Sequence, residues 1–339
     1  MKPLMLLKYF SASALILMSG LSHAADKMPV VRINDFPGVG NPMARVLVDE
    51  KICESHGLTC TLQTIPSASL AIQALVGGSI DVASAGADSG LLAAARGMNL
   101  KVLGNALADT NFFLATGKHV NADISDADYP AVMHQLKGRK IGVAARGSAA
   151  EYQFAALARG AGMSTDDFTM VAVGGPDTAY SALQHKQVDA LLAFEPVAAF
   201  CTVLDTCDIA VDMRKGQGPE ELIDLNGAAA PNFIRAEYAE KNPKIVAALE
   251  AAFKDAEKYY TDPEKWNTVV NIAKQRFPIN NPQADEIIET ALRNTQGAVR
   301  FTLDPQALQQ MADFLYRTKQ IKSPFDTRTL LLSDPTQPR

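Results

Sequence analysis

The chain has 339 residues, of which 47% are hydrophobic and 20% are charged, a balance typical of a globular protein of about two domains. Its formal net charge of -5 argues against nucleic acid or an anionic membrane surface as a partner.

The first 24 residues have the pattern of a cleaved export signal. Lys2 and Lys8 precede the apolar run FSASALILMSGL, and SHA, ending at Ala24, places small residues where a signal peptidase cleaves. A buried helix or a membrane span is the alternative, but the run is too short to span a bilayer. We therefore expect a periplasmic protein that begins near Ala25, with its net charge lowered from -5 to -7 by loss of the two lysines. The residue directly after the cleavage point is not a cysteine, so no lipid anchor is expected there.

Strand and helix patterns alternate from residue 30 onward, which predicts an α/β fold with a mostly parallel sheet and helices on both faces. The expected strands are residues 30–35, 59–65, 80–86, 100–108, 140–145, 168–174 and 188–194. The expected helices between them are residues 41–57, 67–78, 88–97, 149–159 and 177–186.

The alternation predicts two similar lobes. Residues 71–81 and 179–189 align at a constant offset, which indicates either a repeated unit or a local pattern shared by two amphipathic segments. We expect lobe one to comprise 25–113 and 229–339 and lobe two to comprise 117–225, with hinges near 110–117 and 226–234.

Beyond residue 241 the pattern is helical. Four segments each open on an Asn-Pro or Asp-Pro pair, typical of an N-cap followed by a first-turn proline. We expect four helices that pack on lobe one.

The four cysteines form two close pairs, Cys53 with Cys60 and Cys201 with Cys207. In an exported chain this spacing favours two local disulfides, with four buried free thiols as the alternative. A metal site is not expected, because there is no CxxC and the histidines lack ligand spacing. We expect no cofactor.

Small, polar and Gly-rich loops follow the predicted strands, and in open α/β sheets ligands bind beyond the carboxyl ends of the strands. The helix predicted to begin at Ala149 would offer its free N–H groups and the Ser148 hydroxyl to an anion, unless Ser148 only caps its own helix. Phe36 forms either an aromatic wall or ordinary core, and Asp88 is either an N-cap or a ligand contact. Glu195 would bind a ligand ammonium or hydroxyl, or form a salt bridge across the cleft. The candidate ligand residues are Phe36, Pro37, Ser67, Gly86, Asp88, Ser89, Asn111, Gly147, Ser148, Ala149 and Glu195.

Enzyme motifs are missing from the sequence. FPGVGNPM has Met43 where a dinucleotide-binding GxGxxG motif needs its third glycine, and no GxxxxGK[ST] or GxSxG occurs. We expect binding without catalysis.

The segments 69–104 and 136–196 resemble the periplasmic solute-binding components of ABC importers in the nitrate, sulfonate and taurine group, which includes binders of thiamine-precursor pyrimidines. The resemblance runs from about residue 30 to 260. It implies a two-lobed, type II-like binding-protein fold that closes on its ligand and delivers it to a permease, with the loops of the candidate residues around the cleft. Phe194 before Glu195-Pro196 fits the group, whereas the GADS loop at 86–89 departs from the group's proline-bearing version. The Cys-rich iron-binding run of the related pyrimidine synthases is missing.

We therefore expect a monomeric binding protein for a small organic anion or zwitterion, such as a sulfonate or carboxylate, with an ABC permease as its partner. An exported enzyme on the same scaffold and a ligand-sensing component of a signalling receptor are the alternatives.

Overall fold

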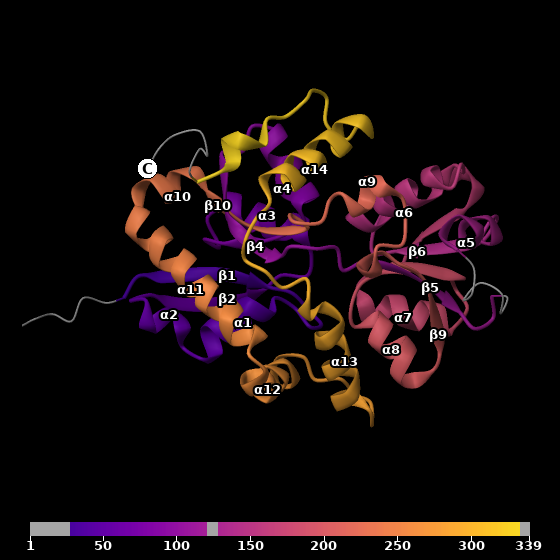
Figure 1. Ribbon diagram of the computed structural model, residues 1–339, viewed down its shortest axis with the longest axis horizontal. Coiled ribbons are helices and arrows are strands. Elements are labelled where there is room, and N and C mark those ends of the chain that lie inside the picture. The colour runs from indigo at the N-terminus through magenta and orange to yellow at the C-terminus, as the bar shows by residue number, and fades with distance from the viewer. Residues whose placement is uncertain (1–27, 121–127, 333–339) are drawn as a thin grey trace, which may run out of the picture.

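The computed structural model describes residues 28–120 and 128–332, so the predicted export signal lies outside the described residues. The chain forms two α/β lobes that lie side by side (Figure 1). We use "lobe one" for the sheet that contains β1 and the helices packed on it, and "lobe two" for the sheet that contains β6 and its helices.

The sheet of lobe one has the strand order β2-β1-β3-β10-β4. Strand β1 pairs in parallel with β2, a parallel bridge between Ile33 and Val82 joins β1 to the segment leading into β3, and β10 is antiparallel to both β3 and β4. Its strands are β1 (Val30–Asp35), β2 (Thr59–Thr64), β3 (Ala83–Ser84), β4 (Leu100–Leu107) and β10 (Ala230–Arg235).

The sheet of lobe two has the corresponding order β7-β6-β8-β5-β9. Strand β6 is parallel to β7 and β8, and β5 is antiparallel to β8 and β9. Its strands are β5 (Phe113–Gly117), β6 (Lys140–Val143), β7 (Thr169–Ala172), β8 (Ala190–Ala193) and β9 (Cys207–Asp212). In each sheet the antiparallel strand is the one that the chain forms directly after crossing from the other lobe.

The two crossing segments, residues 108–112 and 226–229, hydrogen-bond to each other. The Ala108 carbonyl accepts from the N–H groups of Gly227 (2.7 Å) and Ala229 (2.9 Å), and the Asn226 side chain accepts from the Thr110 N–H (2.8 Å). The lobes are therefore joined by one paired ribbon. The predicted hinge movement in this region stays a prediction.

The helices of lobe one differ from the predicted ones at two points. The helix expected over 41–57 is divided, because Lys51 adopts a left-handed conformation (φ 54°) between α1 and α2. Helix α4 begins at Ala87 with Gly86 at its N-cap, so Asp88 lies inside the first turn and is not the cap. The helices are α1 (Pro42–Asp49), α2 (Ile52–Ser55), α3 (Ala68–Val76) and α4 (Ala87–Ala95).

The expected strand at 80–86 is regular only at Ala83–Ser84. Strand β10 pairs with these two residues, and the preceding Val82 forms the bridge to Ile33 of β1. The segment is nevertheless buried from Ile80 to Ala85, as its apolar sequence predicts.

Lobe two follows the predicted alternation closely. The helix expected at 149–159 is α6, and the one expected at 177–186 is α7. The helical segments of this lobe are α5 (Tyr129–Gln135), α6 (Ala149–Gly160), η2 (Thr165–Asp167), α7 (Pro176–Gln184), α8 (Val197–Leu204), η3 (Met213–Lys215) and α9 (Glu220–Ile223).

The four helices expected beyond residue 241 are present as α11, α12, α13 and α14. Asp262 and Asp304 accept hydrogen bonds from the first turns that follow them, whereas the Asn242 side chain makes no cap bond. The segments of this region are α10 (Ala236–Lys241), α11 (Pro243–Thr261), η4 (Pro263–Lys265), α12 (Trp266–Arg276), α13 (Ala284–Gln296), α14 (Pro305–Arg317) and η5 (Thr327–Leu330).

The expectation that the four helices pack on lobe one is incomplete for α13, which also packs on lobe two. This helix lies between α12 and α8 of lobe two (Figure 1). Ala199 and Phe200 of α8 share a buried apolar cluster with Ile288 and Leu292 of α13. The amphipathic sequence of α13 predicted a buried face, but not which lobe would cover it.

Both predicted disulfides are present. Cys53 of α2 is bonded to Cys60 of β2, and Cys201 of α8 is bonded to Cys207 of β9. All four cysteines are buried, so each bridge joins a helix to a neighbouring strand inside its lobe. Of the helices in the described ranges, none is long and apolar enough to cross a membrane.

Candidate ligand site

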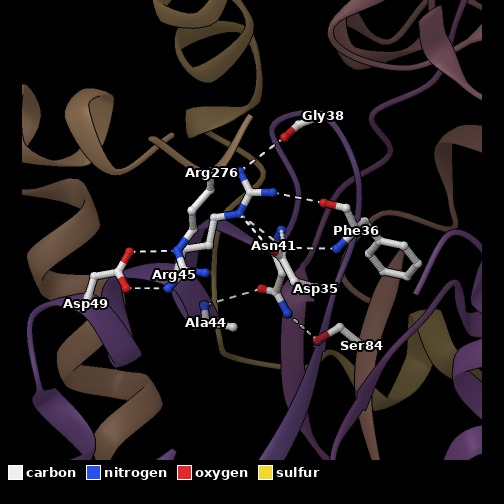
Figure 2. Close-up of polar contacts among 9 residues, drawn as sticks. All are labelled: Asp35, Phe36, Gly38, Asn41, Ala44, Arg45, Asp49, Ser84 and Arg276. Atoms are coloured by element: carbon white, nitrogen blue, oxygen red, sulfur yellow. Dashed lines mark hydrogen bonds and ion pairs between the residues drawn. The ribbon is translucent and has the colours of Figure 1, made fainter. Parts of the chain in front are cut away.

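The loop that follows β1 is shaped by a buried ion pair. Arg45 of α1 donates through Nε to both carboxylate oxygens of Asp35, at 2.9 and 3.1 Å. Its other nitrogens donate to the carbonyls of Phe36 (2.9 Å) and Gly38 (3.1 Å), as Figure 2 shows. Asp35 Oδ1 in turn accepts from the N–H groups of Phe36 (2.9 Å) and Asn41 (3.0 Å). The loop is therefore closed around one guanidinium group, which donates to the Asp35 carboxylate and to two carbonyls of the loop.

Two glycines make this loop possible. A Cβ on Gly40 (φ 66°) would lie 2.0 Å from Arg45 Nη2, so only glycine leaves room for the guanidinium. A Cβ on Gly38 (φ 79°) would lie 3.2 Å from Cδ of Pro196 in lobe two. The loop of lobe one thus lies directly against lobe two.

A chain of buried polar side chains connects this loop to the returning strand β10. The Asn41 side chain donates to Ser84 Oγ, which donates to Oδ1 of Asn232 in β10. Asn34 exchanges two hydrogen bonds with the Ser84 backbone, at 2.6 and 3.1 Å. These four residues are at most 2% exposed, so the bonds between them form away from water.

The other candidate residues of lobe one lie at helix starts. Ser67 caps α3 and accepts from the Leu70 N–H at 3.3 Å. Asp88 is 8% exposed in the first turn of α4, and burial raises its pKa against the opposing backbone hydrogen bonds from Ser89 and from its own N–H. Within the described residues no basic side chain forms an ion pair with Asp88. Its carboxylate lies over Gly86, where a Cβ would be 2.4 Å from Oδ1.

The start of α6 in lobe two only partly matches the prediction. Ser148 occupies the N-cap position, but its hydroxyl makes no cap bond and is a buried oxygen without a hydrogen-bond partner among the described residues. The alternative in which Ser148 serves as a cap is therefore wrong. Glu151 of the first turn accepts from the Gly147 N–H and pairs with Arg146 at 2.8 Å, so one amide of this loop already has a carboxylate partner.

The hydroxyl of Tyr152, in the first turns of α6, is affected by negative charges from both lobes. Burial raises the pKa of its hydroxyl, and the negative charges of Asp88 and Glu151 raise that pKa further. The charge of Asp88 in lobe one thus acts on a hydroxyl in the first turns of α6 in lobe two. Sequence analysis missed Tyr152, although it lies one helical turn after Ser148.

Glu195 already has partners from three elements. Its Oε1 accepts from Arg214 (2.6 Å) and from Asn294 of α13 (2.7 Å), and its Oε2 accepts from the Ala199 N–H (3.0 Å). Burial raises the pKa of Glu195, while Arg214 and the hydrogen bonds oppose that rise. Glu195 therefore joins α13 to lobe two in this structure. Nothing in the local sequence around Arg214 or Asn294 indicated either partner.

Asn111 and the exposed Pro37 lie at the edges of this region. Asn111 is part of the crossing segment 108–112 and is partly buried. Next to it, Phe112 packs edge-on against Phe194, with ring centroids 5.7 Å apart. Phe36 is also partly buried, and its ring points away from the two arginines in Figure 2.

An open groove of about 720 Å³ lies elsewhere, between α14 and η5, and none of the candidate residues lines it. In the parts of the chain that the structure describes, no group of three or more His, Cys, Asp or Glu side chains is arranged to hold a metal ion.

The family model described as "NMT1/THI5 like" matches residues 54–265, more than half of the chain. The chain belongs to this family. Among curated proteins, it is 24% identical over 320 residues to a candidate binding protein of Brucella abortus (strain 2308), covering 91% of this chain and 92% of that protein. A candidate binding protein of Brucella suis biovar 1 matches equally well.

Solved structures confirm the predicted binding-protein fold for this NMT1/THI5-like chain. The aliphatic sulphonate-binding protein SsuA of Escherichia coli superposes with a TM-score of 0.68 at 19% identity, covering 89% of this chain and 97% of that one. The alkanesulfonate-binding SsuA of Xanthomonas axonopodis pv. citri, bound to MOPS, gives 0.70 at 18% identity, with coverages of 91% and 99%. The nitrate-binding protein NrtA of Synechocystis PCC 6803 gives 0.66 at 14% identity, with coverages of 89% and 84%.

Proposed function

We propose that this protein is a periplasmic solute-binding protein that holds a small organic anion or zwitterion between its lobes and delivers it to an ABC permease. The observation that carries the proposal is the meeting of loops from the carboxyl ends of strands in both lobes. Gly38, after β1, lies against Pro196, after β8. Ligands of open α/β sheets bind at such strand ends, and here two sheets contribute them to one region.

Binding between lobes would favour their closed arrangement, because a ligand that contacts both lobes binds that arrangement better. The lobes are joined by a single hydrogen-bonded ribbon, which is compatible with a bending motion. The contact between α13 and α8 would limit its amplitude.

The polar groups of the region favour a ligand with an acidic end. The buried Ser148 hydroxyl has no hydrogen-bond partner in the described part of the chain, and it lies at the start of a twelve-residue helix whose first amides favour negative charge. Hydrogen bonds to a charged ligand group contribute about 1.5–3 kcal/mol each, more than the dipole alone at about 0.3–1 kcal/mol. The sulfonate and nitrate binders with the same fold support this ligand class.

A zwitterion fits the region as well as a simple anion. Asp88 is buried in the first turn of α4, and its charge acts on Tyr152 of α6. A ligand ammonium group beside Asp88 would compensate a carboxylate that has no cationic partner among the described residues. MOPS, the compound bound in the Xanthomonas protein, carries both a sulfonate and an amine that can be protonated. It is therefore a suitable first probe.

We propose the periplasm as the location of the protein and an ABC importer as its partner. The leader over residues 1–24 predicts export, and the sulphonate-binding protein of Escherichia coli and the nitrate-binding protein of Synechocystis are periplasmic. We propose that the mature chain acts as a monomer, does not convert its ligand, and delivers it to the transmembrane subunits of an importer.

The test is a ligand screen with the purified mature chain. We expect mass spectrometry to identify a small molecule that copurifies after gentle isolation. We also expect MOPS, taurine, 1-propanesulfonate, nitrate or a short carboxylate to raise the melting temperature and to give saturable heat in calorimetry. A chain that carries no copurifying molecule and responds to none of these compounds would contradict the proposal.

A further inference from the structure

The loop 36–41 owes its shape to one side chain and not to regular secondary structure. Arg45 is 2% exposed and uses three different nitrogens, which donate to the Asp35 carboxylate, the Phe36 carbonyl and the Gly38 carbonyl. We call these groups, together with the Asn41 N–H that Asp35 accepts, the Arg45 clamp. Figure 2 shows how the clamp gathers the loop around the guanidinium.

The clamp determines which backbone groups and side chains of the loop can contact a ligand. The carbonyls of Phe36 and Gly38 and the N–H groups of Phe36 and Asn41 all point inward to Arg45 or Asp35. These backbone groups are therefore not available to a ligand. The loop presents instead the Phe36 ring, which points away from the arginines, and the bare backbone of Gly38 against Pro196.

The far end of the loop is fixed to the strand that returns from lobe two. Asn41 reaches Asn232 of β10 through the Ser84 hydroxyl. The loop is thus anchored at one end to the β1 terminus and at the other end to β10, with the Arg45 guanidinium between the anchors. Loss of the guanidinium would free the middle of the loop, where Phe36 and Gly38 lie.

We propose that Arg45 is a positioning residue for ligand recognition, which sets the Phe36 ring and the Gly38–Pro196 contact without touching the ligand. This inference rests on the proposed function. Lysine cannot replace Arg45 in this role, because its single ammonium lacks the planar fork that reaches three acceptors in different directions.

A matched control lies in the same cluster. Arg276 of α12 pairs with Asp49 at the end of α1, with Nε 2.7 Å from Oδ2, and its side chain is 29% exposed. Among the described residues, Arg276 forms no hydrogen bond or ion pair with the loop 36–41, although its partner Asp49 lies on α1, the helix that carries Arg45. Replacing Arg276 therefore tests the loss of a neighbouring ion pair without loss of the clamp.

The experiment compares Arg45→Lys with Arg276→Lys in the mature full-length chain. The first measurement is hydrogen–deuterium exchange of the amides of Phe36 and Asn41 without ligand. The second is calorimetric binding of MOPS, taurine and 1-propanesulfonate at a temperature where circular dichroism shows both variants to be folded. Gly40→Ala is a second test of the clamp, because its Cβ would occupy the position of the guanidinium.

We expect Arg45→Lys and Gly40→Ala to speed exchange of these two amides and to weaken binding of the probe by about 10-fold or more, as for the loss of charged hydrogen bonds. Arg276→Lys should change both quantities by less than about 2-fold, as for a partly exposed ion pair. Unchanged exchange or unchanged affinity in folded Arg45→Lys would overturn the inference, as would an equal loss in Arg276→Lys. If the wild-type chain binds none of these three sulfonates, the calorimetry is done with the compound that the ligand screen identifies. If the screen identifies no compound, the proposed function fails and the positioning role fails with it, whereas the exchange data still establish whether the clamp exists.

Discussion

Asn294 Nδ2 donates a 2.7 Å hydrogen bond to Oε1 of Glu195, and this bond ties the C-terminal helix α13 to lobe two. Glu195 also accepts from Arg214, so a single carboxylate is shared between two parts of the protein that are far apart in sequence. A buried charge of this kind is favourable only while its partners stay in place.

Replacing Asn294 by alanine should therefore destabilise the protein. We expect the free energy of unfolding to fall by about 1–3 kcal/mol, because a donor to a buried charged group is lost. Urea denaturation followed by circular dichroism measures the change. Asn267→Ala, on the exposed face of α12, is the control and should stay within about 0.5 kcal/mol of the wild type. Equal effects of the two substitutions would show that the Asn294 bond contributes nothing.

Ser148→Ala should weaken ligand binding without lowering the stability of the fold. The Ser148 hydroxyl has no hydrogen-bond partner within residues 28–120 and 128–332, so its removal should leave the free energy of unfolding unchanged or slightly higher. Affinity for the acidic ligand found in the screen should fall by about 1–3 kcal/mol. Calorimetry and thermal denaturation measure the two quantities.

Ser67→Ala is the comparison variant, and we expect it to lower stability. Ser67 accepts from the Leu70 N–H as the cap of α3, so its loss should cost about 1 kcal/mol of stability. If Ser148→Ala lowers stability in the same way and leaves affinity unchanged, Ser148 has only a structural role.

The two disulfides should each stabilise the protein measurably. Each bridge closes a loop with a sequence separation of six or seven residues, for which chain entropy predicts about 2–3 kcal/mol. Reducing agent should lower the melting temperature, and Cys201→Ser with Cys207→Ser should lower the free energy of unfolding. Thiol titration of the unfolded, unreduced chain should find no free thiol; a count of four would refute both bridges.

Asp81 should make stability depend on acid pH. Burial opposes its ionisation, but hydrogen bonds from Arg32 and the charge of Arg235 lower its pKa in the folded state. Its stabilising contribution is therefore present above the unfolded pKa of about 4 and is lost as the pH falls through the lower, folded pKa. Asp81→Asn should remove this contribution, so we expect a lower free energy of unfolding at pH 7 and a smaller further loss towards pH 3.

Asp88 is the matched control for this experiment, because burial raises its pKa. Its charge destabilises the folded state at pH 7 and has no effect at a pH well below 4, where the group is neutral in both states. Asp88→Asn should therefore raise stability at pH 7, and the difference from wild type should vanish in acid. Urea denaturation from pH 3 to 7 measures both variants, and effects of the same sign would contradict the assignment.

Most of the framework could be predicted from the sequence, because hydrophobic periodicity and turn residues are local signals. The strand at 30–35 and the helix that begins at Ala149 coincide with β1 and α6. The break at Lys51 could not be predicted, because the flanking residues continue a helical pattern and lysine has no preference for a left-handed conformation.

The contacts of the candidate site were much less predictable. FPGVGNP could be identified as a strand-end loop, but its shape depends on Arg45 entering the space that Gly40 leaves open. The partners of Glu195 come from positions 19 and 99 residues further along the chain. Such pairings arise from the arrangement of the whole fold, and a single sequence carries no local signal for them.

The crossing of the chain between the sheets has a consequence for biosynthesis. The five strands of lobe two lie within one continuous stretch, Phe113 to Asp212, whereas the sheet of lobe one needs β10, which is complete only at Arg235. As the ribosome makes the chain from its N-terminus, lobe one must wait for β10, the strand between β3 and β4, although its synthesis starts first. The later lobe can therefore finish folding before the earlier one, and a nascent chain stopped before residue 230 would leave the edges of β3 and β4 unpaired.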